Sequence, residues 1–272
     1  ENTMWKWEAE GQPKAVIAII HSAYEYHRWY AWLIEKLRIE GFHIVMGDLP
    51  GHGEQYKYSR HHNEDFREYR IYTAQLLKVA EEYNLPIFLI GNGFGGLLAL
   101  TALQKTKVEI AGTILLSPWI HLSKTPGKLS NALSSLGKLT SNMKLTHHIT
   151  YENITRNSEV YKELKGDIPY NNVITVKWYQ ELQTLMRLMK NPDMKIKNIP
   201  MLLMTGGQDK ISDVQASKTW FIQHAKHLTH FQYREWPLCY HGLFFEVERE
   251  DILRYTIDFI NNNLRSLGYI IK

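Results

Sequence analysis

Residues 87–96 read IFLIGNGFGG, a short apolar run that passes directly into a glycine-rich turn. Four consecutive apolar residues predict a strand that is buried on both faces of a sheet. The apolar spacing from Phe94 to Gln104 then predicts a helix that begins at the turn itself. This strand, turn and helix form the repeating unit of a parallel sheet covered by helices.

Similar apolar runs predict the other strands, at Ala15–Ile20, His43–Gly47, Thr113–Leu116, Met201–Met204 and Phe231–Trp236, with an edge strand at Trp5–Glu8. Amphipathic patterns between them predict helices at Tyr30–Glu40, Asp65–Tyr83, Val214–Lys226 and Asp251–Leu267. Alternation of strands and helices at this spacing predicts an α/β fold with a mostly parallel, doubly wound sheet.

The segment 119–198 interrupts this rhythm. It contains no clear strand, is rich in Ser, Thr, Asn and Lys, and has one strong helical pattern at Lys177–Met189. We therefore expect a core formed by residues 1–118 and 199–272 and a helical cap formed by residues 119–198. Because the cap follows the carboxyl end of a strand, where open α/β sheets bind ligands, we expect it to cover the site.

The formal net charge is +4, and residues 121–200 hold twelve Lys/Arg against six Asp/Glu, which leaves +6 there and −2 elsewhere. A basic cap is compatible with transient contact with an anionic membrane surface, although a solvated face explains it more simply. No basic cluster predicts nucleic-acid binding.

The single cysteine, Cys239, and the lack of a signal-like apolar segment predict a cytoplasmic protein without disulfides.

The turn at residues 91–95 matches G-x-S-x-G, the nucleophile elbow of serine hydrolases, except that Gly93 stands where the serine belongs. The elbow holds its nucleophile in a strained conformation, which glycine tolerates. Residues 91–96 also fit the dinucleotide pattern G-x-G-x-x-G. That alternative is weaker because its acidic residue should end the following strand, whereas Glu109 precedes that strand.

The other parts of a hydrolytic site follow in the expected order. Asp209 comes just after one predicted strand and His241 after the last, which suits an acid that orients a general base. The oxyanion hole would use the backbone N–H groups of Phe94 and Ala23. The histidines lack partners at metal-ligand spacing, so neither a metal nor another cofactor is expected.

Several segments together resemble the bacterial branch of the monoacylglycerol lipase and lysophospholipase group of α/β-hydrolases, from about Trp5 to Ile260. The matching segments are residues 20–27, 48–53, 91–96, 155–157, 176–179, 206–209 and 240–241. The resemblance implies an α/β-hydrolase fold with a helical cap and cofactor-free cleavage of acyl esters of glycerol or lysophospholipids. The oxyanion segment suggests substrate contacts at His21 and Ser22. Trp119, at the end of a strand, and Trp178 are candidates for lining the pocket, although packing in the core explains them more simply.

The sequence departs from that family at two positions, with Gly93 in place of the serine and Ser22 in place of a glycine. Three interpretations remain open: engineered removal of the nucleophile, a natural non-catalytic member that binds acyl lipids or a protein, and weak hydrolysis by water activated at His241. Gly93→Ser is expected to create ester hydrolysis, and a folded but inert variant would favour a natural site that has decayed.

Overall fold

A computed structural model describes residues 2–56, 62–126, 141–167 and 172–268. Its main sheet has the strand order β1-β3-β2-β4-β5-β8-β9. The strands are β1 (Met4–Trp7), β2 (Ala15–Ile20), β3 (Phe42–Gly47), β4 (Ile87–Asn92), β5 (Gly112–Leu116), β8 (Met201–Gly206) and β9 (Phe231–Trp236). Only β1 is antiparallel to its neighbour in this sheet. The predicted α/β class is confirmed.

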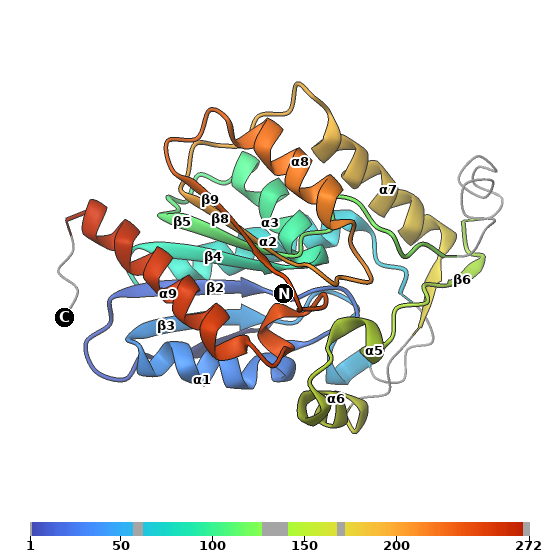
Figure 1. The fold of residues 1–272 in the computed structure, drawn as a ribbon, viewed down its shortest axis with the longest axis horizontal. Helices are drawn as coiled ribbons and strands as arrows, with labels where there is room; N and C mark the ends of the chain where they lie inside the picture. The colour runs from blue at the N-terminus through green and yellow to red at the C-terminus, as the bar shows by residue number, and fades with distance from the viewer. Residues whose placement is uncertain (1, 57–61, 127–140, 168–171, 269–272) are drawn as a thin grey trace.

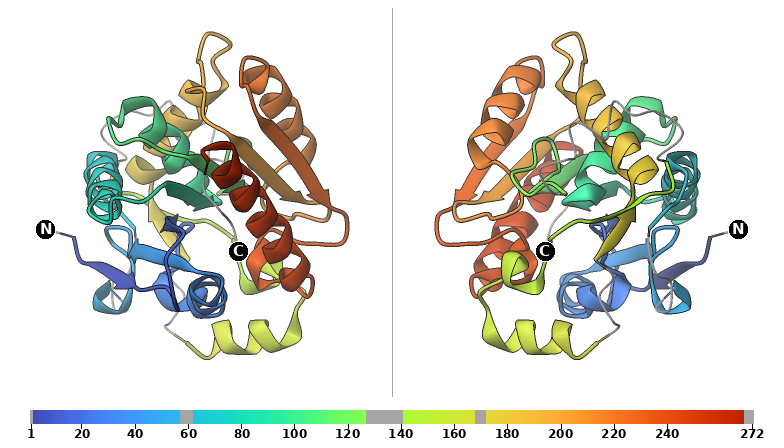
Figure 2. Two further views of the ribbon diagram at one scale, coloured as in Figure 1. Left: turned by 90° about the vertical axis from the view of Figure 1, so that its left-hand side faces the viewer. Right: turned by 90° about the vertical axis from the view of Figure 1, so that its right-hand side faces the viewer.

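Helices cover both faces of the sheet (Figures 1 and 2). One face carries α1 (Ala31–Ile39) and α9 (Arg249–Ser266), and the other carries α2 (Phe66–Glu81), α3 (Phe94–Lys105) and α8 (Val214–Ala225). Because both faces are covered, the five central strands, from β3 to β8 in sheet order, are buried along their whole length. This explains why their sequences are continuous apolar runs rather than alternating ones.

Local sequence signals fix the ends of several helices. The Asp213 side chain accepts a hydrogen bond from the Ala216 N–H at 2.9 Å and caps α8. Asp65 caps α2 in the same way, through the Arg67 N–H. Gly41 follows α1 with φ +93°, the left-handed conformation that glycine adopts readily after a helix.

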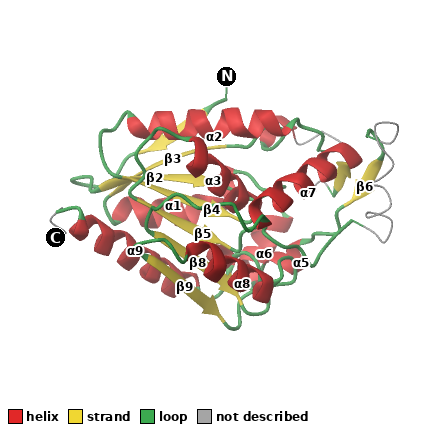
Figure 3. Ribbon diagram, turned by 90° about the horizontal axis from the view of Figure 1, so that it is seen from above, coloured by secondary structure: helices red, strands yellow, loops and turns green. Residues whose placement is uncertain are grey.

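The cap elements lie between β5 and β8 in the chain and gather at one end of the sheet (Figure 3). They are β6 (Lys144–Thr146), α5 (Tyr151–Ile154), α6 (Ser158–Lys165), β7 (Val173–Thr175) and α7 (Val176–Lys190). The expectation of no strand in this segment was wrong, because β6 and β7 form an antiparallel pair. Strands of three residues are too short to leave a periodic pattern in the sequence.

Within the described ranges, no helix combines the length and apolar character needed to cross a membrane.

Candidate active site

Gly93 lies at the turn between β4 and α3, with φ +55° and ψ −118°. This conformation is strained for any residue with a Cβ, by about 1–3 kcal/mol. The neighbouring glycines allow close packing of the helix against the strand and the loop after β2. A Cβ on Gly95 would lie 2.3 Å from the Ile20 carbonyl oxygen, and one on Gly91 would lie 2.6 Å from the Gly95 carbonyl oxygen. The elbow geometry is therefore present without its hydroxyl.

The structure brings Asp209 and His241 together from the ends of β8 and β9. His241 Nδ1 lies 2.8 Å from Asp209 Oδ2, and both side chains are buried. The other carboxylate oxygen of Asp209 accepts the Ile211 and Ser212 backbone N–H groups at 2.7 and 2.9 Å, which fixes its orientation. This arrangement suits an imidazole held as a general base.

His241 Nε2 accepts a hydrogen bond from the Trp119 indole N–H at 3.2 Å. Since an indole nitrogen only donates, Nε2 is unprotonated and the ring proton lies on Nδ1, toward Asp209. The Ser117 hydroxyl donates to the His241 carbonyl at 2.8 Å and holds the loop itself. The base is therefore in the tautomer that can take a proton.

Ser22 occupies the volume beside residue 93. A Cβ built on Gly93 would lie 2.3 Å from Ser22 Oγ, 2.9 Å from Ser22 Cβ and 3.1 Å from His241 Nε2. The Phe94 N–H, one expected oxyanion donor, donates to Ser22 Oγ at 3.0 Å. A serine at position 93 would thus collide with Ser22. The expectation that Gly93→Ser alone restores a site therefore needs correction.

His21 binds backbone groups rather than facing residue 93. Its Nδ1 donates to the Ser22 carbonyl at 2.7 Å, and its Nε2 accepts the Leu49 N–H at 2.9 Å. Burial lowers the pKa of this imidazole, which keeps it neutral. Both ring nitrogens are engaged with backbone groups, so His21 positions the loop, and the substrate contact expected from the sequence stays a prediction.

Aromatic side chains cover the elbow from the core and the cap. The Trp178 ring lies 5.4 Å from that of Phe94, and its indole N–H donates to the Tyr69 hydroxyl at 2.9 Å. Tyr24 lies within 6.2 Å of both Trp119 and Trp178, measured between ring centroids. Its ring stacks on His147 of the cap at 3.8 Å. Trp119 and Trp178 therefore belong to one cluster over the site.

Sequence reasoning missed Glu25, which joins the loop after β2 to the end of β4. Its carboxyl group accepts the Ser22 N–H and the Asn92 side-chain amide, each at 3.1 Å, and the Tyr30 hydroxyl. Burial raises the pKa of Glu25 to about 8, although these hydrogen bonds act in the opposite direction. A lone glutamate in a loop gives no sequence signal that it is buried.

The raised pKa of Glu25 predicts a loss of stability in mild alkali. The folded pKa of about 8 exceeds the ordinary value of 4.5, so the folded state binds this proton more tightly than the unfolded chain does. The stabilisation is complete below pH 4.5 and is lost as the pH rises through 8. Between pH 6 and 9 we expect a loss of about 2–3 kcal/mol, which Glu25→Gln should abolish.

Urea unfolding of the parent and of Glu25→Gln at both pH values measures this loss as a difference, in which other titrating groups cancel. A difference between the two proteins that does not change with pH would contradict the assignment.

Glu246 is a second residue that sequence reasoning missed. Its carboxylate is fully buried and accepts the Thr155 hydroxyl at 2.7 Å, the Arg156 N–H at 2.8 Å and the Tyr240 N–H at 2.6 Å. The first two belong to the cap and the third precedes His241. Glu246 therefore ties the cap to the loop that carries the base.

Cys239, Glu246 and Glu248 form the group that meets metal-ligand distances within the described part of the chain. Arg156 already pairs with both carboxylates there. Burial raises the pKa of the Cys239 thiol, which keeps it protonated. The cluster is a side-chain ion network in which Cys239 is a small buried residue.

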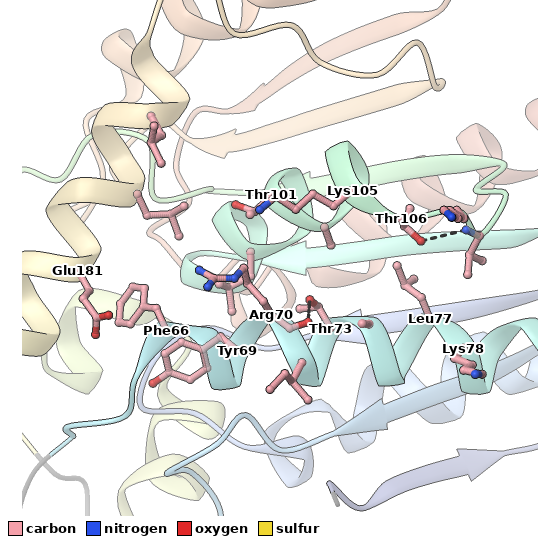
Figure 4. Close-up of a pocket in the computed structure, with 18 of the residues that line it drawn as sticks. Phe66, Tyr69, Arg70, Thr73, Leu77, Lys78, Thr101, Lys105, Thr106 and Glu181 are labelled. Atoms are coloured by element: carbon pink, nitrogen blue, oxygen red, sulfur yellow. Dashed lines mark hydrogen bonds between the residues drawn. The ribbon is translucent and has the colours of Figure 1, made fainter.

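A separate cavity of about 730 Å³ lies between α2, α3 and α7 (Figure 4). Its apolar lining includes Leu77, Leu98 and Ala102, and cations such as Arg70 and Lys105 also border it. Phe66 lines this cavity and also packs against Phe94, with ring centroids 5.7 Å apart. Tyr69 also lines the cavity and packs against Phe94 at 5.3 Å, so Phe66 and Tyr69 together separate the cavity from the site around Gly93.

A mostly parallel sheet with an elbow after β4, an acid after β8 and a histidine after β9 defines an α/β-hydrolase. The sequence model of the family described as "Serine aminopeptidase, S33" matches residues 11–248, so the chain belongs to this hydrolase family.

Individual relatives agree with this assignment. The chain is 37% identical over 253 residues to phospholipase YtpA of Bacillus subtilis, covering 92% of this chain and 96% of the relative. The crystal structure of Paleococcus ferrophilus monoacylglycerol lipase has the same fold, with a TM-score of 0.81 and 23% identity over 97% of this chain and 99% of that one. A soluble variant of Saccharomyces cerevisiae monoglyceride lipase, in complex with a substrate analogue, superposes with a TM-score of 0.79 and 17% identity over 96% of this chain and 91% of that one.

Proposed function

We propose that the protein binds single-chain acyl esters, monoacylglycerols or lysophospholipids, in the hydrolase site, and that residue 93 supplies no nucleophile. Hydrolysis by the ordinary route is then absent, and turnover is at most slow. This proposal combines two of the three interpretations that the sequence left open, the non-catalytic lipid binder and the weak hydrolase.

The proposal depends mainly on one observation: the hydrogen bond between Asp209 and His241 is preserved beside a residue, Gly93, that has no hydroxyl. Asp209 and His241 are bonded at 2.8 Å, and His241 Nε2 lies 3.1 Å from the point where a Cβ on residue 93 would stand. The names of the relatives support the substrate class, since they include a phospholipase and several monoglyceride lipases. The aromatic cluster of Tyr24, Trp119 and Trp178 offers apolar surface for an acyl chain.

Lipid binding can be measured without turnover by titrating the protein with a 1-O-alkylglycerol, whose ether bond cannot be hydrolysed. We expect saturable binding of one ligand per chain by calorimetry. Trp119→Ala should weaken binding by about tenfold or more, equivalent to about 1.4 kcal/mol, because it removes one wall of the site.

Ala102→Trp is the matched control, because it fills the separate cavity between α2 and α3. Binding to this variant should stay within about twofold of the parent value. A folded protein that shows no saturable binding would contradict the proposal. Loss of binding in Ala102→Trp alone would place the lipid in the cavity of Figure 4 and overturn the assignment to the hydrolase site.

A further inference from the structure

We propose that Ser22 is the nucleophile of this protein, so that the reactive hydroxyl has moved from the elbow to the loop that faces it. The inference rests on the proposed function only for the identity of the ester. The position of the hydroxyl, its hydrogen-bond partners and the state of the base carry the argument.

The position of the hydroxyl comes first. Ser22 Oγ lies 2.3 Å from the point where a Cβ on residue 93 would stand, and that point is 3.1 Å from His241 Nε2. The hydroxyl therefore fills the volume where a serine side chain of the elbow would begin. The absence of a Cβ at Gly93 is what makes room for it, so the two departures from the family complement each other sterically.

The backbone around Ser22 holds this hydroxyl in place. The Ser22 N–H donates to Glu25 at 3.1 Å, and the Ser22 carbonyl accepts from His21 at 2.7 Å. The side chain is buried, with 5% of the residue surface exposed. A nucleophile needs this kind of fixed placement, because small displacements reduce the rate strongly.

The hydrogen bond from Phe94 favours reactivity at Ser22. Its N–H donates to Ser22 Oγ at 3.0 Å, so it stabilises negative charge that develops on the oxygen as the proton leaves. His241 Nε2 is unprotonated and able to take that proton. It is bonded to the Trp119 indole at 3.2 Å, and this bond must give way to one from Ser22 when an ester binds. Such rearrangements between the free and loaded states are common in enzymes.

The resulting reaction is an acyl transfer in two halves. Ser22 Oγ attacks the ester carbonyl carbon, its proton passes to His241 Nε2, and the carbonyl oxygen becomes an oxyanion. The Phe94 N–H then moves from Oγ to this oxyanion, with the Ala23 N–H as the second donor. Collapse breaks the carbon–oxygen bond to the alcohol, which leaves with the proton from His241. Water, deprotonated by His241, then attacks the carbonyl carbon of the acyl–Ser22 ester. The bond from this carbon to Ser22 Oγ breaks, Oγ takes the proton back from His241, and the fatty acid is released.

An alkyl fluorophosphonate tests this proposal, because it phosphonylates an activated serine and needs no lipid binding. The protein is incubated with the probe, digested and analysed by mass spectrometry. The expected result is one adduct on the peptide that contains Ser22. Ser22→Ala should label at least tenfold more slowly, and His241→Gln should also slow labelling because the base is lost.

Ser123→Ala is the matched control, since its hydroxyl only donates to the Ile211 carbonyl at 3.2 Å, and it should label like the parent. Ser22→Gly serves as the second variant if Ser22→Ala fails to fold. A folded parent protein that stays unlabelled would overturn the proposal, and so would labelling that persists in both Ser22 variants. Labelling at Ser22 without binding of the ether lipid would retain this inference and reject only the proposed substrate class.

Discussion

Exchanging the residues at positions 22 and 93, as Ser22→Gly together with Gly93→Ser, is expected to raise ester hydrolysis by about 10³-fold or more over the parent protein. Ser22 can attack only after the bond between Trp119 and His241 gives way, so we expect slow turnover in the parent protein. Because a well-placed serine is worth up to about 10⁶-fold in kcat, a serine at the elbow can exceed the parent by a wide margin. Asp209 and His241 already form a hydrogen bond of 2.8 Å, so the general base that a serine at position 93 needs is in place. The measurement is kcat/KM on p-nitrophenyl butyrate and on a monoacylglycerol.

Two further variants test separately whether Ser22 obstructs the elbow and whether Asp209 supports the reaction. Gly93→Ser alone should gain far less activity, because its Cβ would stand 2.3 Å from Ser22 Oγ. It should also unfold more easily, by about 1–3 kcal/mol, since residue 93 has φ +55°. In the double variant, the further change Asp209→Asn should lower kcat by about 10⁴-fold. Equal activity of the double variant and of Gly93→Ser would show that Ser22 does not obstruct the elbow.

Glu246→Ala is expected to lower the free energy of unfolding by about 3–5 kcal/mol, because each buried donor left without an acceptor costs about 1–3 kcal/mol. The change leaves the Arg156 and Tyr240 N–H groups and the Thr155 hydroxyl without their carboxylate partner. It also leaves the Arg156 guanidinium with less opposing charge. Urea denaturation, followed by circular dichroism, measures the loss.

Glu250→Ala is the matched control for Glu246. Glu250 pairs with Lys36 at 3.1 Å, but both side chains are largely exposed. Exposed pairs contribute at most about 1 kcal/mol, so this variant should remain close to the parent. Similar losses in the two variants would mean that Glu246 does not tie the cap to the core.

The sequence predicted the main sheet well, because strands buried on both faces consist of continuous apolar residues. Each predicted strand of this sheet is present, with ends shifted by at most two residues, as in β8, which extends from the expected Met204 to Gly206. Helix caps were also readable, since Asp213 supplies its side chain directly to the first turn of α8. Both signals depend on residues that are close together in the chain, so they can be recognised in a single sequence.

The site was readable only in part, because its remaining interactions join distant segments. Motif order was enough to pair Asp209 with His241. By contrast, the contact between Ser22 and residue 93 spans 71 positions and depends on how the loop after β2 meets α3. The burial of Glu25 and Glu246 depends on the assembled fold in the same way. The pair β6–β7 was missed for another reason, because each strand has only three residues.

The attachment of the cap next to α5 helps to position His241. The Gly242 N–H donates to the Ile154 carbonyl at 2.8 Å. The Thr155 hydroxyl lies 2.7 Å from both the Phe245 carbonyl and the Glu246 carboxylate, which share its single proton. An outward movement of Ile154 and Thr155 would therefore shift the neighbouring His241 and separate its imidazole from Asp209. Because Gly242 directly follows His241 in the chain, the position of the imidazole depends on how the α5 edge of the cap is attached.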